Sequence, residues 1–156
     1  MREIPKKNYY ILAILLIVTV ILTLLLSSIS LNKEETFSDF YEYSNKIVPE
    51  EFDEYMLENN DIIIYISSKY DLSNKTFENR FQKKLNNLNL KENLIFIDKN
   101  DINTKFLKKF KKTYGINLNL KKTPIIVVII DEKVIKKITV SSNTNVDTII
   151  EYEDFR

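Results

Sequence analysis

Hydrophobic and polar positions divide the chain into one long apolar segment and a region where short apolar runs alternate with polar ones. Residues 9–26 carry no charge, and a helix continued to residue 31 would rise roughly 34 Å, enough to cross a hydrocarbon core. Thr19 and Thr23 are compatible with a span, because threonine hydroxyls bond to carbonyls one turn earlier. We predict four regions: a cytoplasmic N-terminus over 1–8, a transmembrane helix over 9–31, a partly helical connector over 32–42 and a domain over 43–156.

The charges that flank the apolar segment predict its orientation. Arg2, Lys6 and Lys7 precede it, whereas residues 33–35 (Lys-Glu-Glu) follow it, so the positive-inside rule places the domain outside the cell membrane. A cleaved signal peptide is the alternative, but its apolar core would be shorter and would end at small residues. Residues 28–30 (Ser-Ile-Ser) match such a cleavage site poorly, which favours an uncleaved single-pass anchor.

Beyond the anchor, apolar β-branched runs predict strands, and the strongest of them are continuous enough to be buried on both faces. The predicted strands are residues 43–48, 61–67, 94–97, 124–130 and 134–140, of which the first is weak. Residues 131–133 join the last two strands as the turn of a hairpin.

Helical spacing predicts the elements between these strands. Pro49 with two following acids begins one helix, and Asn59 ends it. A longer helix carries an apolar stripe formed by Phe77, Phe81, Leu85 and Leu88. Glu78 is predicted to belong to the polar face of this helix. The stripe of the next helix ends at Gly115; it is Phe106, Leu107, Phe110 and Tyr114. Thr144 and Asp147 form a capping box that predicts a final helix.

The predicted order is strand, helix, strand, helix, strand, helix, strand, strand, helix. Alternation followed by a hairpin predicts an α/β fold with a mixed central sheet that has helices on both faces.

Composition narrows the chemistry available to this domain. The chain has no cysteine and no histidine, which removes disulfide exchange, thiolate nucleophiles and the usual zinc, copper and haem ligands. Its one glycine excludes a glycine-rich phosphate loop. Basic and acidic residues nearly balance, at a net charge of +1, so nothing indicates nucleic-acid binding. We expect no cofactor, no metal and no nucleic-acid partner.

Two segments within residues 43–156 resemble the thioredoxin-like fold family. One contains residues 114–116 (Tyr-Gly-Ile), 123–125 (Thr-Pro-Ile) and the turn at 131–133 (Asp-Glu-Lys), similar to a thioredoxin run whose proline is cis. The other, residues 63–81, is similar to the redox segment of membrane-anchored bacterial thioredoxin-like proteins, including bacteriocin transport accessory proteins. The resemblance implies a thioredoxin-like mixed sheet and a cis-proline.

The resemblance also implies where a C-x-x-C motif would lie. Aligned on Phe77-Glu78 without gaps, the motif falls on Asp71-Leu72-Ser73-Asn74, so both cysteine positions lack sulfur. Dithiol exchange needs two sulfur atoms, and the domain is therefore expected to be redox-inactive. Asp71 or Ser73 is expected to cap the following helix instead, and a catalytic acid at Asp71 is the sharper alternative.

Thr123-Pro124 is the candidate peptide-binding site that the resemblance implies. In the family, the backbone beside this proline pairs with an extended peptide; the alternative is a turn that serves only the fold. The lysines at 108–109 and 111–112 are expected to form a solvated face, with attraction to anionic lipid or wall polymer as the alternative.

We expect a protein that is not an enzyme and that binds a protein or peptide at the bacterial cell envelope, for example as an accessory to bacteriocin export or immunity. A chaperone-like holder of extended peptides at Thr123-Pro124 is the first alternative. A cofactor-free hydrolase or transferase built on carboxylates and serine is the second, and no sequence feature recommends it.

Overall fold

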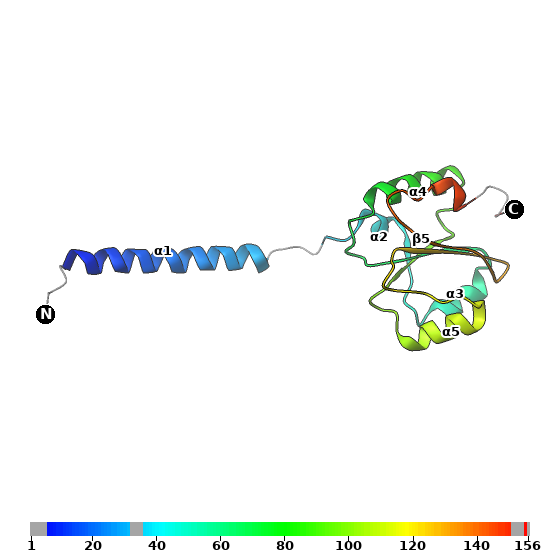
Figure 1. Ribbon diagram of the computed structural model, residues 1–156, viewed down its shortest axis with the longest axis horizontal. Helices are drawn as coiled ribbons and strands as arrows, with labels where there is room; N and C mark the ends of the chain where they lie inside the picture. Colours follow the sequence, from blue (N-terminus) through cyan, green and yellow to red (C-terminus); the bar gives the residue numbers. More distant parts are fainter. Residues whose placement is uncertain (1–5, 32–35, 151–154, 156) are drawn as a thin grey trace. The chain divides into compact units, whose positions relative to one another are not determined.

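Apolar β-branched runs form a five-stranded mixed sheet in the computed structural model, which describes residues 6–31, 36–150 and 155 (Figure 1). The strands are β1 (Asn45–Lys46), β2 (Ile62–Ser67), β3 (Leu94–Asp98), β4 (Ile125–Ile130) and β5 (Lys133–Thr139). Their order in the sheet is β1-β3-β2-β4-β5. The first three strands are parallel, whereas β4 runs antiparallel to β2 and β5 antiparallel to β4.

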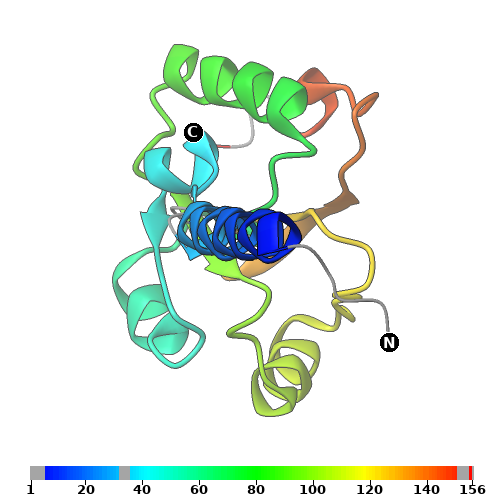
Figure 2. The ribbon, with the colours of Figure 1, turned by 90° about the vertical axis from the view of Figure 1, so that its left-hand side faces the viewer.

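Helices cover both faces of this sheet. They are α2 (Asp39–Tyr43), α3 (Phe52–Glu58), α4 (Lys75–Asn87), α5 (Thr104–Tyr114) and the 3₁₀ turn η1 (Val146–Thr148). Figures 1 and 2 show α4 and η1 on one side of the sheet and α3 and α5 on the other. This is the α/β architecture with a mixed central sheet that the hydrophobic pattern predicted, and that prediction is confirmed.

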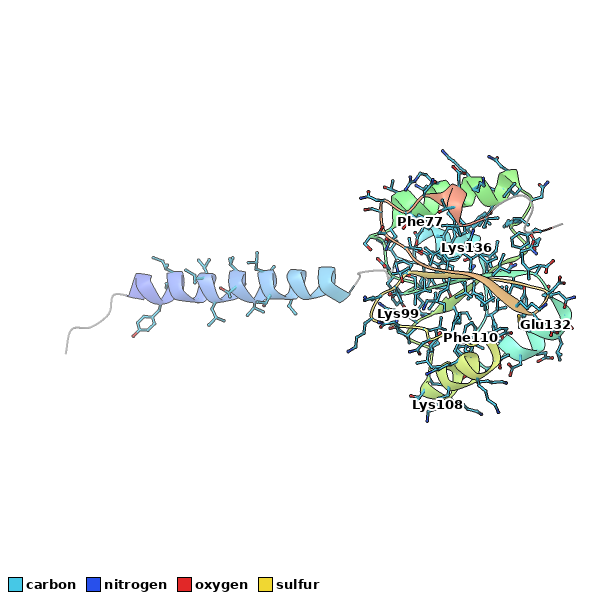
Figure 3. All side chains as sticks on the ribbon, turned by 45° about the vertical axis from the view of Figure 1, so that its right-hand side comes forward. Phe77, Lys99, Lys108, Phe110, Glu132 and Lys136 are labelled. Carbon is cyan, nitrogen blue, oxygen red and sulfur yellow. The ribbon has the colours of Figure 1, made fainter. Side chains whose placement is uncertain are left out.

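The side-chain alternation of the strands divides the core into two clusters. On β2, Ile63 and Tyr65 join the cluster beneath α2, α4 and η1, whereas Ile64 joins the cluster beneath α3 and α5. Figure 3 shows Phe77 of α4 and Phe110 of α5 on opposite sides of the sheet. Every residue of β2 and β3 is buried, as strands enclosed by helices on both faces require.

Two local predictions about turns are borne out. Gly115 ends α5 in the left-handed region (φ 71°), and its N–H donates to the carbonyl of Lys111. The β4–β5 hairpin turns through Asp131 (φ 48°) and Glu132 (φ 61°), a two-residue loop in which both residues have positive φ.

The beginning of the domain differs from the prediction. The chain divides into two units between Glu35 and Thr36, and α2 lies within the second unit. Phe40 of α2 is only 1% exposed and its ring lies 4.7 Å from that of Tyr65. The predicted connector over residues 32–42 therefore overlaps the folded unit, and the first strand is shorter than the predicted 43–48 because Tyr43 is helical.

The final helix was predicted wrongly in type and in cap. In the described stretch up to residue 150, the structure has the 3₁₀ turn η1 there, capped by Asn145, whose side chain accepts from the N–H of Asp147 at 3.0 Å. Thr144 instead accepts from the N–H of Ser141 at 2.8 Å. Ile149 and Ile150, which follow at once, are fully buried in the core beside α4.

The unit before Thr36 contains α1 (Lys6–Leu31), and its side chains are described at residues 9–11 and 13–24. All of these are exposed. The hydroxyl of Thr19 donates to the carbonyl of Leu15 at 2.8 Å, and that of Thr23 to the carbonyl of Val20 at 2.8 Å, which confirms the expected backbone bonding. Among the described residues, no helix combines the length and apolar character of a membrane span.

Candidate functional site

The topology brings three loop segments together at one edge of the sheet. Parallel strands β2 and β3 end side by side, with Ser67 paired to Asp98, and antiparallel β4 begins at the same edge, with Ile125 paired to Ile66. The N–H of Lys99 donates to the carbonyl of Ser67 at 2.8 Å and ties the first two segments together. The carboxyl ends of parallel strands are where ligand crevices form in open α/β sheets. Residues 68–74, Lys99 and Thr123-Pro124 therefore define the candidate site.

Hydrogen bonds to Asp71 shape the loop at residues 68–74. Its Oδ1 accepts from the N–H of Ser73 at 2.9 Å and from the Ser73 hydroxyl at 2.6 Å, and its Oδ2 accepts from the Asn74 amide at 3.3 Å. This is an Asx-type turn that leaves Leu72 at the tip. Partial burial alone would raise the pKa of Asp71, but the bonds from Ser73 and Asn74 and the charge of Lys99 hold that pKa below its ordinary value.

The expected capping role of Asp71 or Ser73 is wrong. The N-cap residue of α4 is Asn74, and no side chain makes a capping hydrogen bond to the helix. The oxygens of Asp71 are engaged by Ser73 and Asn74 before the helix begins, so they organise the loop rather than the helix end.

We expect the Asp71→Ala variant to lose up to about 1 kcal/mol of unfolding free energy, because a partly exposed set of hydrogen bonds is screened by solvent. The depressed pKa of Asp71 means that its contribution is present above the unfolded pKa and is lost as pH falls through the folded pKa. Urea titrations of the wild type and Asp71→Ala across acid pH should therefore converge at the acid end. A difference that persists undiminished in strong acid would contradict this account, and Asp101→Ala is the control on an exposed acid.

Thr123-Pro124 lies at the start of β4, and its peptide bond is cis, as the family resemblance implied. The carbonyl of Pro124 accepts from the N–H of Val140 at 2.8 Å, which joins this corner to the end of β5. The Thr123 hydroxyl accepts from the ammonium of Lys99 at 3.3 Å. Within the described part of the chain, the main-chain N–H and C=O of Thr123 form no hydrogen bond. They are the groups an added extended segment would pair with.

Asp98 at the end of β3 belongs to the same edge and was not singled out from the sequence. Its carboxylate is buried, with Oδ1 accepting from the N–H of Asn100 at 2.9 Å. Its Oδ2 has no hydrogen-bond partner among the described residues, and the Lys69 ammonium lies 4.0 Å from it. Burying a carboxylate costs free energy unless hydrogen bonds or an opposite charge compensate for the lost water. The signal that could have found Asp98 is an acid that directly follows a buried apolar strand.

Glu78 was predicted on the polar face of the long helix, and this prediction is wrong. It is only 4% exposed, and its Oε1 accepts from the Tyr65 hydroxyl at 2.7 Å. Burial raises the pKa of Glu78, the charges of Asp71 and Asp39 raise it further, and the bond from Tyr65 opposes them. Burial together with Glu78 raises the pKa of Tyr65 far above its ordinary value. Tyr65 and Glu78 thus form a hydrogen-bonded polar pair in the core beneath the candidate site.

A separate pocket of about 350 Å³ lies between α3 and α5. Buried aromatic rings form its floor, including Phe52 and Phe106, which meet edge to face at 5.6 Å. On its rim Lys109 forms an ion pair with Asp53, while Lys108 on the same helix points into solvent (Figure 3). No group of three or more acidic side chains suited to a metal ion occurs among the described residues, here or at the sheet edge.

The strand order, the strand directions and the cis-proline before β4 together define a thioredoxin-like fold. The loop before α4 carries Asp71 and Asn74, and the chain contains no cysteine.

Comparison with family models and with curated proteins finds no match. Among solved structures, the chain is similar to one from a study of the thiol-resolving mechanism in yeast mitochondrial 1-Cys peroxiredoxin via glutathione/thioredoxin systems. That similarity has a TM-score of 0.48 at 16% identity and covers 70% of this chain and 92% of the other.

Proposed function

We propose that this chain is a membrane-anchored, redox-inactive thioredoxin-like protein that acts by binding a protein or peptide at the bacterial cell envelope. The proposal rests on the main-chain N–H and C=O groups of Thr123, which are able to pair with an extended segment. Its main-chain groups have no partner among the described residues and lie beside a site whose cysteine positions hold Asp71 and Asn74. Main-chain pairing needs no catalytic group, so binding is the activity best suited to this site.

The anchor in this proposal rests on the apolar segment over residues 9–31. The basic residues before it favour a cytoplasmic N-terminus and an extracytoplasmic domain. The described side chains of α1 are apolar around the helix and exposed. A helix of that character usually lies in a protein interior or in a membrane.

A role as an accessory to bacteriocin export or immunity is the specific form of this proposal that the sequence resemblance suggests. Genes for a peptide exporter next to the gene of this protein would support that form. The chaperone-like alternative uses the same Thr123-Pro124 corner and differs only in accepting many unfolded clients. A hydrolase or transferase is not favoured, because the Asp71 carboxylate is engaged within its own loop.

The test is site-specific photo-crosslinking with the full chain in native membranes. A photoreactive residue at Thr123 should capture a permanently unfolded probe, reduced and carboxymethylated α-lactalbumin, several-fold more than the same residue at Thr113, an exposed threonine of α5. The chain should remain in the membrane fraction after carbonate extraction, and insulin reduction should stay at background. Equal crosslinking at the two positions would contradict peptide binding, and reduction above background would contradict the redox-inactive assignment.

A further inference from the structure

Half of the exposed large apolar side chains described in the second unit lie within the candidate site or next to it. The unit's exposed residues of this kind are Phe37, Val48, Leu57, Tyr70, Leu72 and Ile135. Phe37 stacks on Tyr70, with ring centroids 5.4 Å apart and an interplanar angle of 19°. Leu72 follows two residues later in the same loop. We call Phe37, Tyr70 and Leu72 the aromatic loop patch.

The patch combines apolar surface with a cation. The ammonium of Lys69 lies 5.3 Å from the centroid of the Tyr70 ring and 5.9 Å from that of Phe37. Phe37 and Tyr70 are each 38% exposed and Leu72 is 52% exposed. Aromatic rings, a leucine and a lysine are the side chains that favour the boundary between lipid headgroups and acyl chains.

The Asx-type turn at Asp71 holds the aromatic loop patch at the protein surface. Because both Asp71 oxygens bind residues on the far side of the loop tip, the chain turns sharply at Leu72. The N–H of Ser38 donates to the carbonyl of Lys69 at 2.8 Å, so the segment with Phe37 is fastened to the same loop. The patch is therefore a fixed feature of the domain rather than three unrelated exposed residues.

The short chain between α1 and Phe37 limits what can cover the aromatic loop patch. Only residues 32–36 separate the end of α1 at Leu31 from Phe37, and the six residue steps between these two span at most about 22 Å when fully extended. If residues 9–31 cross the bilayer, the patch stays close to the membrane surface, where tethering gives a high effective concentration. A soluble partner would have no such advantage.

We propose that the aromatic loop patch docks on the headgroup region of the bilayer that the anchor crosses, with Leu72 and Tyr70 at the lipid interface and Lys69 drawn to anionic lipid. This inference rests on the proposed membrane anchor. It makes the segment that replaces a redox motif a membrane-contacting loop, and it places the Thr123 corner near the membrane surface.

The test uses the full chain in vesicles of phosphatidylcholine with phosphatidylglycerol. The protein has no tryptophan, so one can be introduced as a depth probe. In the Leu72→Trp variant, lipids with spin labels near the headgroup should quench fluorescence several-fold more than in the Leu57→Trp variant. Leu57 is the matched control because it is an exposed leucine, at 86%, on α3 across the sheet. Adding Lys69→Glu to the Leu72→Trp variant should reduce the quenching several-fold, whereas adding Lys108→Glu should not.

The outcomes separate the anchor from the patch. Loss of the wild-type chain from vesicles after carbonate extraction would overturn the anchor, and with it this inference. A vesicle-bound chain in which the Leu72→Trp and Leu57→Trp variants are quenched equally would overturn the docked patch and leave the anchor standing. Quenching of the Leu57→Trp variant alone would place the α3 and α5 side on the membrane instead, and would also overturn it.

Discussion

Replacing Phe40 by alanine is expected to lower the unfolding free energy of the domain by about 3–5 kcal/mol. The Phe40 ring is 1% exposed and lies 4.7 Å from the Tyr65 ring and 6.0 Å from the Phe81 ring. Truncation would remove buried apolar surface and leave a cavity between α2, the sheet and α4. A loss of this size would make the segment from Thr36 to Tyr43 an essential part of the domain.

Urea unfolding of the full chain in detergent micelles, followed by near-ultraviolet circular dichroism of the tyrosines, measures this loss. Phe37→Ala is the matched control, since Phe37 is a phenylalanine of the same segment whose ring is largely at the surface. It should cost well under half as much. Equal costs for the two variants would mean that the segment from Thr36 to Tyr43 acts as a linker, as the sequence pattern had suggested.

The hydrophobic pattern predicted the sheet and its class because the strongest strands consist almost entirely of β-branched residues. It allowed for helix in this segment but did not predict that α2 packs into the domain, because five helical residues are too few to establish a period and a single buried ring at Phe40 looks the same as an exposed one. It failed at the last helix because Ile149 and Ile150 suit a helix by spacing, yet both are drawn into the core directly after η1.

The candidate site was predictable only where its residues are neighbours in sequence. The gap-free alignment placed Asp71, Ser73 and Asn74 in one loop, but the same spacing suits a helix cap and an Asx turn. The approach of Lys99 to Thr123 depends on β2 lying between β3 and β4, which no local pattern encodes. These contacts arise from the strand order and not from any spacing in the chain.

The sequence itself carries a signal for the buried pair of Tyr65 and Glu78. A tyrosine within an otherwise aliphatic strand that is buried on both faces must find a partner for its hydroxyl. The helix that covers this strand carries Glu78 next to the apolar stripe residue Phe77, one position round the helix. An acceptor beside the apolar stripe of the covering helix therefore predicts the pair.

That pair gives the second large expected effect. Tyr65→Phe removes the only hydrogen-bond donor to the Glu78 side chain among the described residues, and it should cost about 1–3 kcal/mol of unfolding free energy near neutral pH. The loss should depend on pH. Burial already raises the pKa of Glu78, and the missing hydrogen bond would raise it further. Stability linked to protonated Glu78 is fully present below the unfolded pKa and is lost as pH rises through the folded pKa.

The cost of Tyr65→Phe should accordingly be small in acid and grow as the solution becomes neutral, when measured by urea unfolding at a series of pH values. Glu78→Gln keeps the acceptor oxygen without the charge, so it should flatten the profile and be at least as stable as the wild type at neutral pH. Tyr43→Phe, which removes an exposed hydroxyl bond to Asn86, is the matched control and should cost little at any pH. A cost of Tyr65→Phe that does not vary with pH would mean that Glu78 keeps one protonation state throughout, and that the pair stabilises the core as an ordinary neutral hydrogen bond.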